Sequence, residues 1–157
     1  MKLERIIDKH GRQPENLIHV LLEYQQCKED NALTEEELSR IAREMRVTES
    51  HVYSIVTFYS LFSIKPRGKY IIQVCDNVAC HVNGALDVVR ELEELLHIRM
   101  GETTEDGIFT VEHTSCIGCC DKPPAIRIGG ELYGNITPNR LAELIATYRR
   151  RYHEQKE

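Results

Sequence analysis

The sequence lacks the apolar segments that mark membrane and secreted proteins. None of its apolar runs approaches the roughly 20 residues that a membrane-spanning helix requires. Its first ten residues, MKLERIIDKH, are charged throughout and have no apolar centre of the kind found in secretory signals. We therefore expect a chain with no membrane span, in the cytoplasm or on the cytoplasmic side of a membrane complex, where thiols stay reduced.

Phosphate-binding signatures are also missing. The sequence contains no G-x-G-x-x-G run and no P-loop, so we expect the chain to carry no nucleotide or flavin of its own. It holds 25 acidic against 20 basic residues and has a net charge of −5. Because binding to phosphates needs a basic face, this balance argues against nucleic acid as a partner.

Cysteine is scarce in one half of the chain and concentrated in the other. Only Cys27 lies within the first 74 residues, whereas the other five cysteines fall between positions 75 and 120. In a reducing compartment, such a concentration indicates metal or redox chemistry more than structural disulfides. With 157 residues and 41% hydrophobic content, the chain suits one globular domain or two small ones.

The first 65 residues are predicted to form a helical bundle domain. Pro14 stands near one helix start, Thr34 with Glu37 forms a capping box at a second, and Thr48 caps a third. We interpret the aromatic stretch TFYSLF, residues 57–62, as part of the core because it extends the apolar spacing of the third helix. The turn-rich sequence KPRG then marks a domain boundary.

Residues 69–157 change to a mixed pattern of strands and helices. The predicted elements are a strand over 69–75, a helix over 84–97, a strand over 107–113, a hairpin around Gly129-Gly130, and a last helix that Thr137 and Pro138 open. A helix that crosses between the first two strands makes them parallel. The whole chain is therefore predicted as α+β, a helical bundle followed by a small α/β domain of thioredoxin-like character.

This order of elements brings the cysteines together. Cys75 ends the first strand and Cys116 follows the second, and parallel strands deliver both loops to the same edge of the sheet. Cys75 and Cys80 can then meet Cys116 and either Cys119 or Cys120. The pattern predicts a site of four thiolates assembled from two loops.

Three kinds of chemistry fit these thiols. A [2Fe–2S] cluster and a zinc ion both take four cysteines, and the C-x4-C spacing of the first pair is wider than the usual zinc knuckle. The spacing thus favours iron–sulfur and leaves a structural zinc module as an alternative. A thiol–disulfide oxidoreductase would use Cys116 and Cys119, but its motif normally opens a helix, and the sequence DKPP follows here.

The motifs CDNVAC and SCIGCC, with VTESHVYSIVTFYSLF before them and LYGNITPNRL after them, resemble one family along nearly the whole chain. It is the [2Fe–2S] subunit of NADH-oxidising complexes: the 24 kDa-type subunit of respiratory complex I, with relatives in NAD(P)-linked hydrogenases and formate dehydrogenases. The resemblance implies a thioredoxin-like ferredoxin domain. It also implies a [2Fe–2S] cluster on Cys75, Cys80, Cys116 and Cys120.

The same resemblance implies an electron-transfer role inside a larger NAD(P)H oxidoreductase. The partners would be a flavoprotein subunit that binds FMN and NAD(P)H, together with further iron–sulfur subunits, and no residue here would act as a catalytic acid, base or nucleophile. Which of the parent complexes is concerned stays open. Cys119 and Cys27 are interpreted as bystanders that behave as small buried apolar residues, and His81 and His113 receive little weight as ligands.

Overall fold

In a computed structural model, residues 2–155 are described and form two compact units that divide between Arg67 and Gly68. Each unit has its own apolar core. Within residues 2–155, no helix combines the length and the apolar character needed to cross a lipid bilayer. The α+β class predicted for the chain is confirmed, with helices early and a mixed sheet later.

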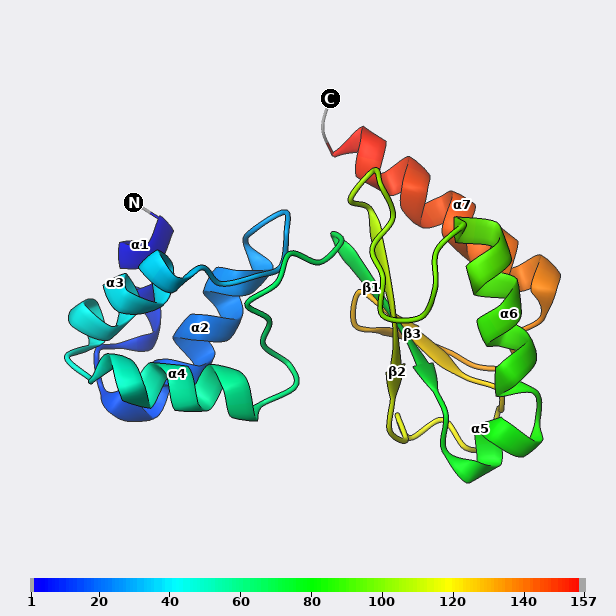
Figure 1. The fold of residues 1–157 in the computed structure, drawn as a ribbon, viewed down its shortest axis with the longest axis horizontal. Coiled ribbons are helices and arrows are strands. Elements are labelled where there is room, and N and C mark those ends of the chain that lie inside the picture. The colour runs from blue at the N-terminus through cyan, green and yellow to red at the C-terminus, as the bar shows by residue number, and fades with distance from the viewer. Residues whose placement is uncertain (1, 156–157) are drawn as a thin grey trace. The chain divides into compact units, whose positions relative to one another are not determined.

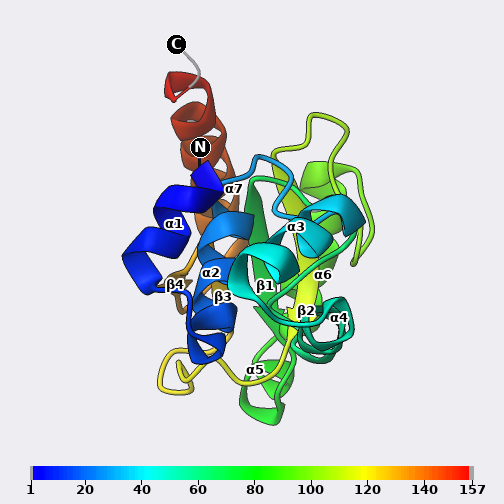
Figure 2. The ribbon, with the colours of Figure 1, turned by 90° about the vertical axis from the view of Figure 1, so that its left-hand side faces the viewer.

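The first unit is helical (Figures 1 and 2). Its elements are α1 (Lys2–His10), the short 3-10 turn η1 (Pro14–Asn16), α2 (Leu17–Gln26), α3 (Glu35–Met45) and α4 (Glu49–Phe58). The predicted capping box is present: Thr34 Oγ1 accepts the Glu37 amide at 3.3 Å, and the Glu37 carboxylate accepts the Thr34 amide at 2.8 Å. Thr48 Oγ1 likewise accepts the amide of His51 at the start of α4.

Helix α1 was not anticipated from the charged N-terminus. Its apolar residues Leu3, Ile6 and Ile7 follow helical spacing, and all three are buried in the core of the first unit. The charges that obscure the pattern lie on the exposed side of the helix. A single apolar stripe on a charged segment is therefore sufficient to dock this helix.

The prediction that TFYSLF is part of the core was wrong for every residue of the stretch except Phe62. Only Phe62 is buried, whereas Phe58 is 78% exposed and Tyr59 is 39% exposed. Helix α4 ends at Phe58, so the chain leaves helical spacing and Tyr59 no longer continues the buried row of the helix. The buried Gln25 fixes the new path, because its amide donates to the Leu61 carbonyl and accepts from the Ser63 amide.

The second unit has the predicted order of strands and helices. It comprises β1 (Tyr70–Cys75), α5 (Val78–Val82), α6 (Ala85–Leu96), β2 (Phe109–Thr114), β3 (Ile126–Ile128), β4 (Glu131–Tyr133) and α7 (Pro138–Glu154). The sheet order is β2-β1-β3-β4, with β1 and β2 parallel and the other pairs antiparallel. This is the thioredoxin-like arrangement that the sequence predicted, with the short helix α5 added.

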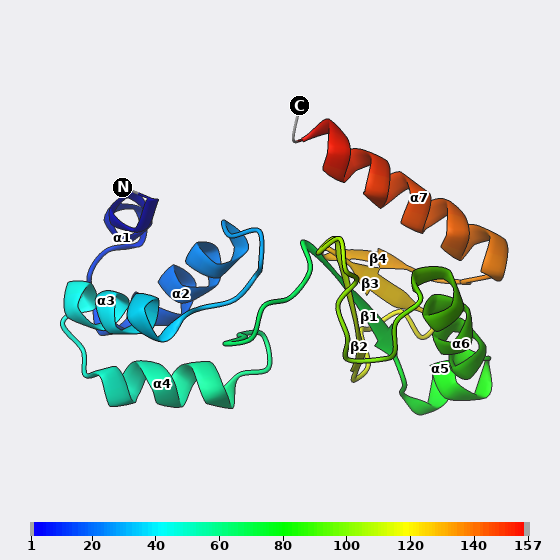
Figure 3. The ribbon, with the colours of Figure 1, turned by 45° about the horizontal axis from the view of Figure 1, so that its top comes forward.

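Helices α6 and α7 lie on the same face of the sheet (Figures 1 and 3). They bury an apolar layer to which β1, β2 and β3 contribute Ile72, Val111 and Ile126. The opposite face carries a polar row in which Gln73 donates to Glu112 at 2.6 Å and accepts from Arg127 at 2.7 Å. The apolar core thus lies on one face of the sheet only, and the loops that follow β1 and β2 leave from the carboxyl ends of these strands.

Candidate functional site

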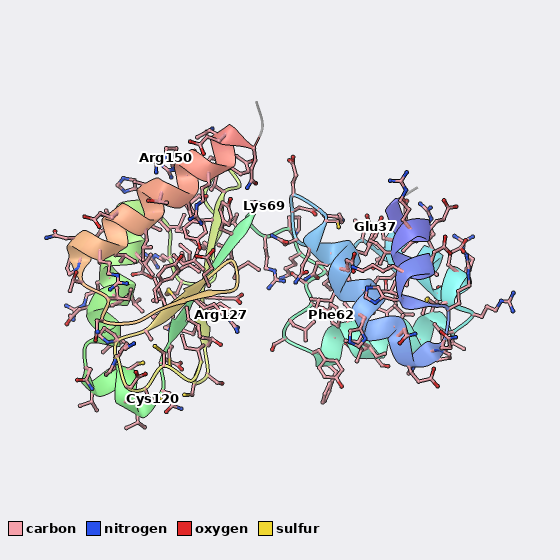
Figure 4. All side chains as sticks on the ribbon, turned by 180° about the vertical axis from the view of Figure 1, so that it is seen from behind. Glu37, Phe62, Lys69, Cys120, Arg127 and Arg150 are labelled. Carbon is pink, nitrogen blue, oxygen red and sulfur yellow. The ribbon has the colours of Figure 1, made fainter. Side chains whose placement is uncertain are left out.

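Two loops leave the sheet at one edge and carry the clustered cysteines. Cys75, the last residue of β1, pairs with Thr114, the last residue of β2, so the segment with Cys116 begins beside Cys75. Helix α5 then turns the chain back after β1 and places Cys80 in the interior. Figure 4 shows Cys120 on the neighbouring loop at the same end of the unit as α5.

The four thiols form a continuous series of contacts. Cys75 and Cys80 pack in one buried cluster, Cys75 influences the thiol of Cys116, and the sulfurs of Cys116 and Cys120 are 3.3 Å apart. Among residues 2–155, no three His, Cys, Asp or Glu side chains converge closely enough to hold a single metal ion. The four cysteines supply four thiolates, which is the number that two irons need when each iron binds two thiolates.

The two halves of the site differ in exposure and in proton affinity. Cys75 and Cys80 are buried, whereas Cys116 and Cys120 are exposed. Burial, with a hydrogen bond to Cys75, raises the pKa of Cys80 to about 11. The pKa of Cys116 is lowered because the Gly118 amide and the Cys120 thiol donate to it. Metal binding requires thiolates, so a bound metal must displace the proton that Cys80 holds.

The side chain of Cys119 is less exposed than those of Cys116 and Cys120. It is partly buried and packs with Ile117 against a small buried cluster formed by Cys75, Cys80, Ala85 and Ala125. Its sulfur lies 3.0 Å from the place that a Cβ atom on Gly134 would occupy. The sulfur of Cys119 thus lies beside Gly134, directly after β4, whereas the sulfur of the neighbouring Cys120 contacts that of Cys116.

The remaining candidates from the sequence do not join this group. His113 is about half exposed, and its ring lies 4.0 Å from Asp76 rather than against a thiol. Cys27, interpreted as a buried apolar residue, is exposed, because α2 ends at Gln26 and leaves Cys27 as its C-cap. The predicted burial was wrong, whereas the role of Cys27 as a bystander stays a prediction.

Gly134 was not identified from the sequence as part of the site, yet it supports the cysteine loop. A Cβ atom there would stand 2.6 Å from Lys122 Cβ and 2.7 Å from the Lys122 carbonyl oxygen. The adjacent Asn135 amide also donates to that carbonyl at 2.7 Å. The close approach of β4 to the loop needs a residue without a side chain.

We predict that Gly134→Ala will loosen the site without preventing folding. Displacing the loop costs roughly 1–3 kcal/mol, as overpacking usually does. We expect about 1.4 kcal/mol of this cost to destabilise the cluster-loaded state. An iron chelator should then remove the cluster from the variant about 10-fold faster than from the wild-type protein. The decay of visible absorbance measures the rate.

Gly130→Ala is the matched control, because Gly130 has no atom within 4 Å of its added Cβ. That variant should lose some stability, since Gly130 has a φ of 96°, but should retain the cluster as wild type does. Equal rates of cluster loss in the two variants would contradict the supporting role of Gly134.

Comparison with known proteins gives the family. Residues 3–149 match the family described as thioredoxin-like [2Fe-2S] ferredoxin. The chain is 40% identical over 108 residues to the NADP-reducing hydrogenase subunit HndA of Solidesulfovibrio fructosivorans, covering 69% of this chain and 63% of that protein. It is 38% identical over 109 residues to an NADH-quinone oxidoreductase subunit from Escherichia coli K12, covering 69% of this chain and 66% of that one.

A longer match agrees with this result, and a solved structure has a similar fold. An NADH-quinone oxidoreductase subunit from Rickettsia felis is 33% identical over 148 residues, covering 92% of this chain and 87% of that protein. The fold also matches a crystal structure of NAD+-reducing [NiFe]-hydrogenase in the H2-reduced state. There the TM-score is 0.75 at 22% identity, over 88% of this chain and 23% of that one. The chain belongs to the thioredoxin-like [2Fe-2S] ferredoxin family, and its cofactor is a [2Fe–2S] cluster.

Proposed function

We propose that this chain is the electron-transfer subunit of an NAD(P)H-linked multisubunit oxidoreductase and that Cys75, Cys80, Cys116 and Cys120 hold its cluster. The observation that carries the proposal is the unbroken contact series of these four thiols at the carboxyl edge of the parallel strands β1 and β2. The family match supports the cofactor, and the names of the relatives support the type of complex.

The chemistry of the cofactor defines what the partner must do. A bound [2Fe–2S] cluster takes up and releases one electron at a time, whereas NAD(P)H delivers a hydride, so another group has to split the electron pair. A flavin can do so, and we propose an FMN-containing subunit as the partner, beside further iron–sulfur subunits. The protein's own contribution is to hold four thiolates, two buried and two exposed, and to exclude water from the inner pair.

The two alternatives from the sequence have less support. A thiol–disulfide exchange site would need Cys116 and Cys119 as a pair, but Cys116 contacts Cys120 instead, while the sulfur of Cys119 packs toward Gly134. A structural zinc module has less support because the family to which the chain belongs is described by an iron–sulfur cofactor. As an iron–sulfur subunit, the chain is proposed to work in the reducing cytoplasm or on the cytoplasmic side of a membrane.

Reduction by NAD(P)H through a flavoprotein tests the function. The cluster-loaded chain, mixed anaerobically with the FMN-containing subunit of the same organism, should be reduced when NAD(P)H is added. The reduced cluster should then give an electron paramagnetic resonance signal, whereas NAD(P)H alone should leave the cluster oxidised. A cluster that dithionite reduces but that NAD(P)H with the flavoprotein does not would count against the proposed function.

A further inference from the structure

The loop between β2 and β3 holds two exposed thiols in contact. Residues 115–122 are each exposed or partly exposed, and Cys116 and Cys120 are among the exposed ones. The sulfurs of Cys116 and Cys120, called the outer pair below, are 3.3 Å apart. The inner thiols, Cys75 and Cys80, are each 1% exposed. A small solute therefore reaches the outer pair before it reaches the inner thiols.

The loop that carries the outer pair is held at both ends and open in its middle. The Asp76 amide donates to the Thr114 carbonyl at 3.2 Å before the pair, and the Asn135 amide donates to the Lys122 carbonyl at 2.7 Å after it. Apart from its chain neighbours, no atom of residues 2–155 lies within 4 Å of a Cβ added to Gly118, in the middle of the loop. A disulfide bond is about 2 Å long, so the two sulfurs have to approach by roughly a further 1.3 Å. The open surroundings of Gly118 leave room for this small movement.

Cys119, in the same loop, is less suited to pair with either exposed thiol. Its side chain is partly buried, and its sulfur lies beside Gly134. The Cα atoms of adjacent residues are about 3.8 Å apart, whereas a disulfide usually joins Cα atoms at least about 4.4 Å apart, so a bond from Cys119 to Cys120 is disfavoured. The geometry therefore favours a bond between Cys116 and Cys120.

Two accessible thiols in contact are the arrangement that converts oxidation by a peroxide into a disulfide. Hydrogen peroxide oxidises one thiol to a sulfenic acid: the O–O bond breaks, one oxygen stays on the sulfur, and the other leaves as water. The second thiol then attacks the oxidised sulfur, the S–O bond breaks, and a second water leaves as the S–S bond forms. The two cysteines have then lost two electrons and two protons, and the peroxide has been reduced to two molecules of water.

We infer that Cys116 and Cys120 form a reversible disulfide when a chain without its cluster meets a peroxide. The second thiol captures the sulfenic acid before more peroxide oxidises it irreversibly. The bond lies at an exposed position, so thiol reductants reach it and restore the pair. The consequence for loading rests on the proposed function: the bond withdraws two of the four ligands, and an oxidised chain receives no cluster until it is reduced.

Mass spectrometry of the cluster-free full chain tests the inference. The reduced chain is treated with hydrogen peroxide without oxygen, its remaining thiols are alkylated, and its tryptic peptides are mapped without a reductant. We expect the peptide that contains Cys116 and Cys120 to carry a disulfide between them, while the other four cysteines are alkylated. Dithiothreitol should restore both thiols. The initial rate of cluster loading should be at least about 10-fold lower for the oxidised chain than for the reduced chain.

Three variants sharpen the experiment. In Cys120→Ser no second thiol captures the sulfenic acid, so Cys116 should proceed to sulfinic and sulfonic acid, which dithiothreitol does not reverse. Cys119→Ala is the matched control and should form the same disulfide as wild type. Cys27→Ala removes the exposed cysteine of the first unit and should also leave the disulfide unchanged, which excludes a link between two chains through Cys27.

Two results would overturn the inference while leaving the proposed function intact. The first is irreversible oxidation of Cys116 or Cys120 in the wild-type chain with no disulfide between them. The second is a mixture of pairings in which Cys75, Cys80 and Cys119 take part as often as the outer pair does, as an unfolded chain would give. A chain that carries the disulfide yet loads a normal cluster as fast as the reduced chain would instead reject the ligand roles of the outer pair, and with them the proposed site.

Discussion

Cys120→Ser is expected to abolish the normal [2Fe–2S] cluster, leaving either no bound iron or a cluster with a clearly altered paramagnetic resonance signal. Each iron of the cluster needs two thiolates, and Cys120 is the residue whose sulfur lies 3.3 Å from that of Cys116. Serine keeps the size of the side chain but offers oxygen in place of sulfur. Anaerobic reconstitution followed by iron analysis and spectroscopy measures the effect. Serine at Cys75, Cys80 or Cys116 should behave in the same way.

Cys119→Ala is the control for this experiment, and it separates two adjacent thiols. Because the sulfur of Cys119 packs toward Gly134, its removal should leave iron content and spectrum close to wild type, with at most a shift in reduction potential. Loss of the cluster in Cys119→Ala with retention in Cys120→Ser would reverse the assignment. If only the double variant lost the cluster, the two thiols would be interchangeable as the fourth ligand.

Gly68→Ala is expected to destabilise the second unit by about 3 kcal/mol, at the upper end of overpacking costs. A Cβ atom on Gly68 would lie 2.5 Å from the carbonyl carbon and 2.8 Å from the amide nitrogen of Phe109. Both are backbone atoms of β2, so the strand itself would have to move. The Gly68 amide also donates to Thr110 Oγ1 at 2.6 Å, and this bond would be strained as well. Urea unfolding followed by circular dichroism measures the loss.

Gly107→Ala provides the comparison. Gly107 has a φ of 68° but no atom within 4 Å of an added Cβ, so only backbone strain, worth about 1–2 kcal/mol, is expected there. If Gly68→Ala were no more destabilising than Gly107→Ala, the close contact between Gly68 and β2 could not be important for stability.

Local signals in the sequence were sufficient for the sheet and for most of the helices. The Thr34–Glu37 capping box, the Gly129-Gly130 hairpin and the Thr137-Pro138 helix start each depend on contacts within a few residues, and each is present. The parallel pairing of β1 and β2 followed from the helix between them. The shared edge of those two strands was then enough to predict that the two cysteine loops lie together.

Features that depend on where a helix stops were harder to foresee. The end of α4 at Phe58 exposes an aromatic ring that periodicity had placed in the core, and the end of α2 at Gln26 exposes Cys27. Helix α5 is only five residues long, too short to show periodicity, although the four residues inside the C-x4-C motif leave room for one helical turn. The role of Gly134 comes from a contact with Lys122, which no local pattern reveals.

The metal and sulfide content of the full chain after anaerobic reconstitution, combined with spectroscopy of the same sample, tests the cluster assignment directly. We predict a red-brown protein with about two irons and about two acid-labile sulfides per chain, and a paramagnetic resonance signal that develops on one-electron reduction. A colourless protein that holds zinc on the same cysteines, or a metal-free protein that reduces disulfides through Cys116 and Cys119, would contradict this assignment.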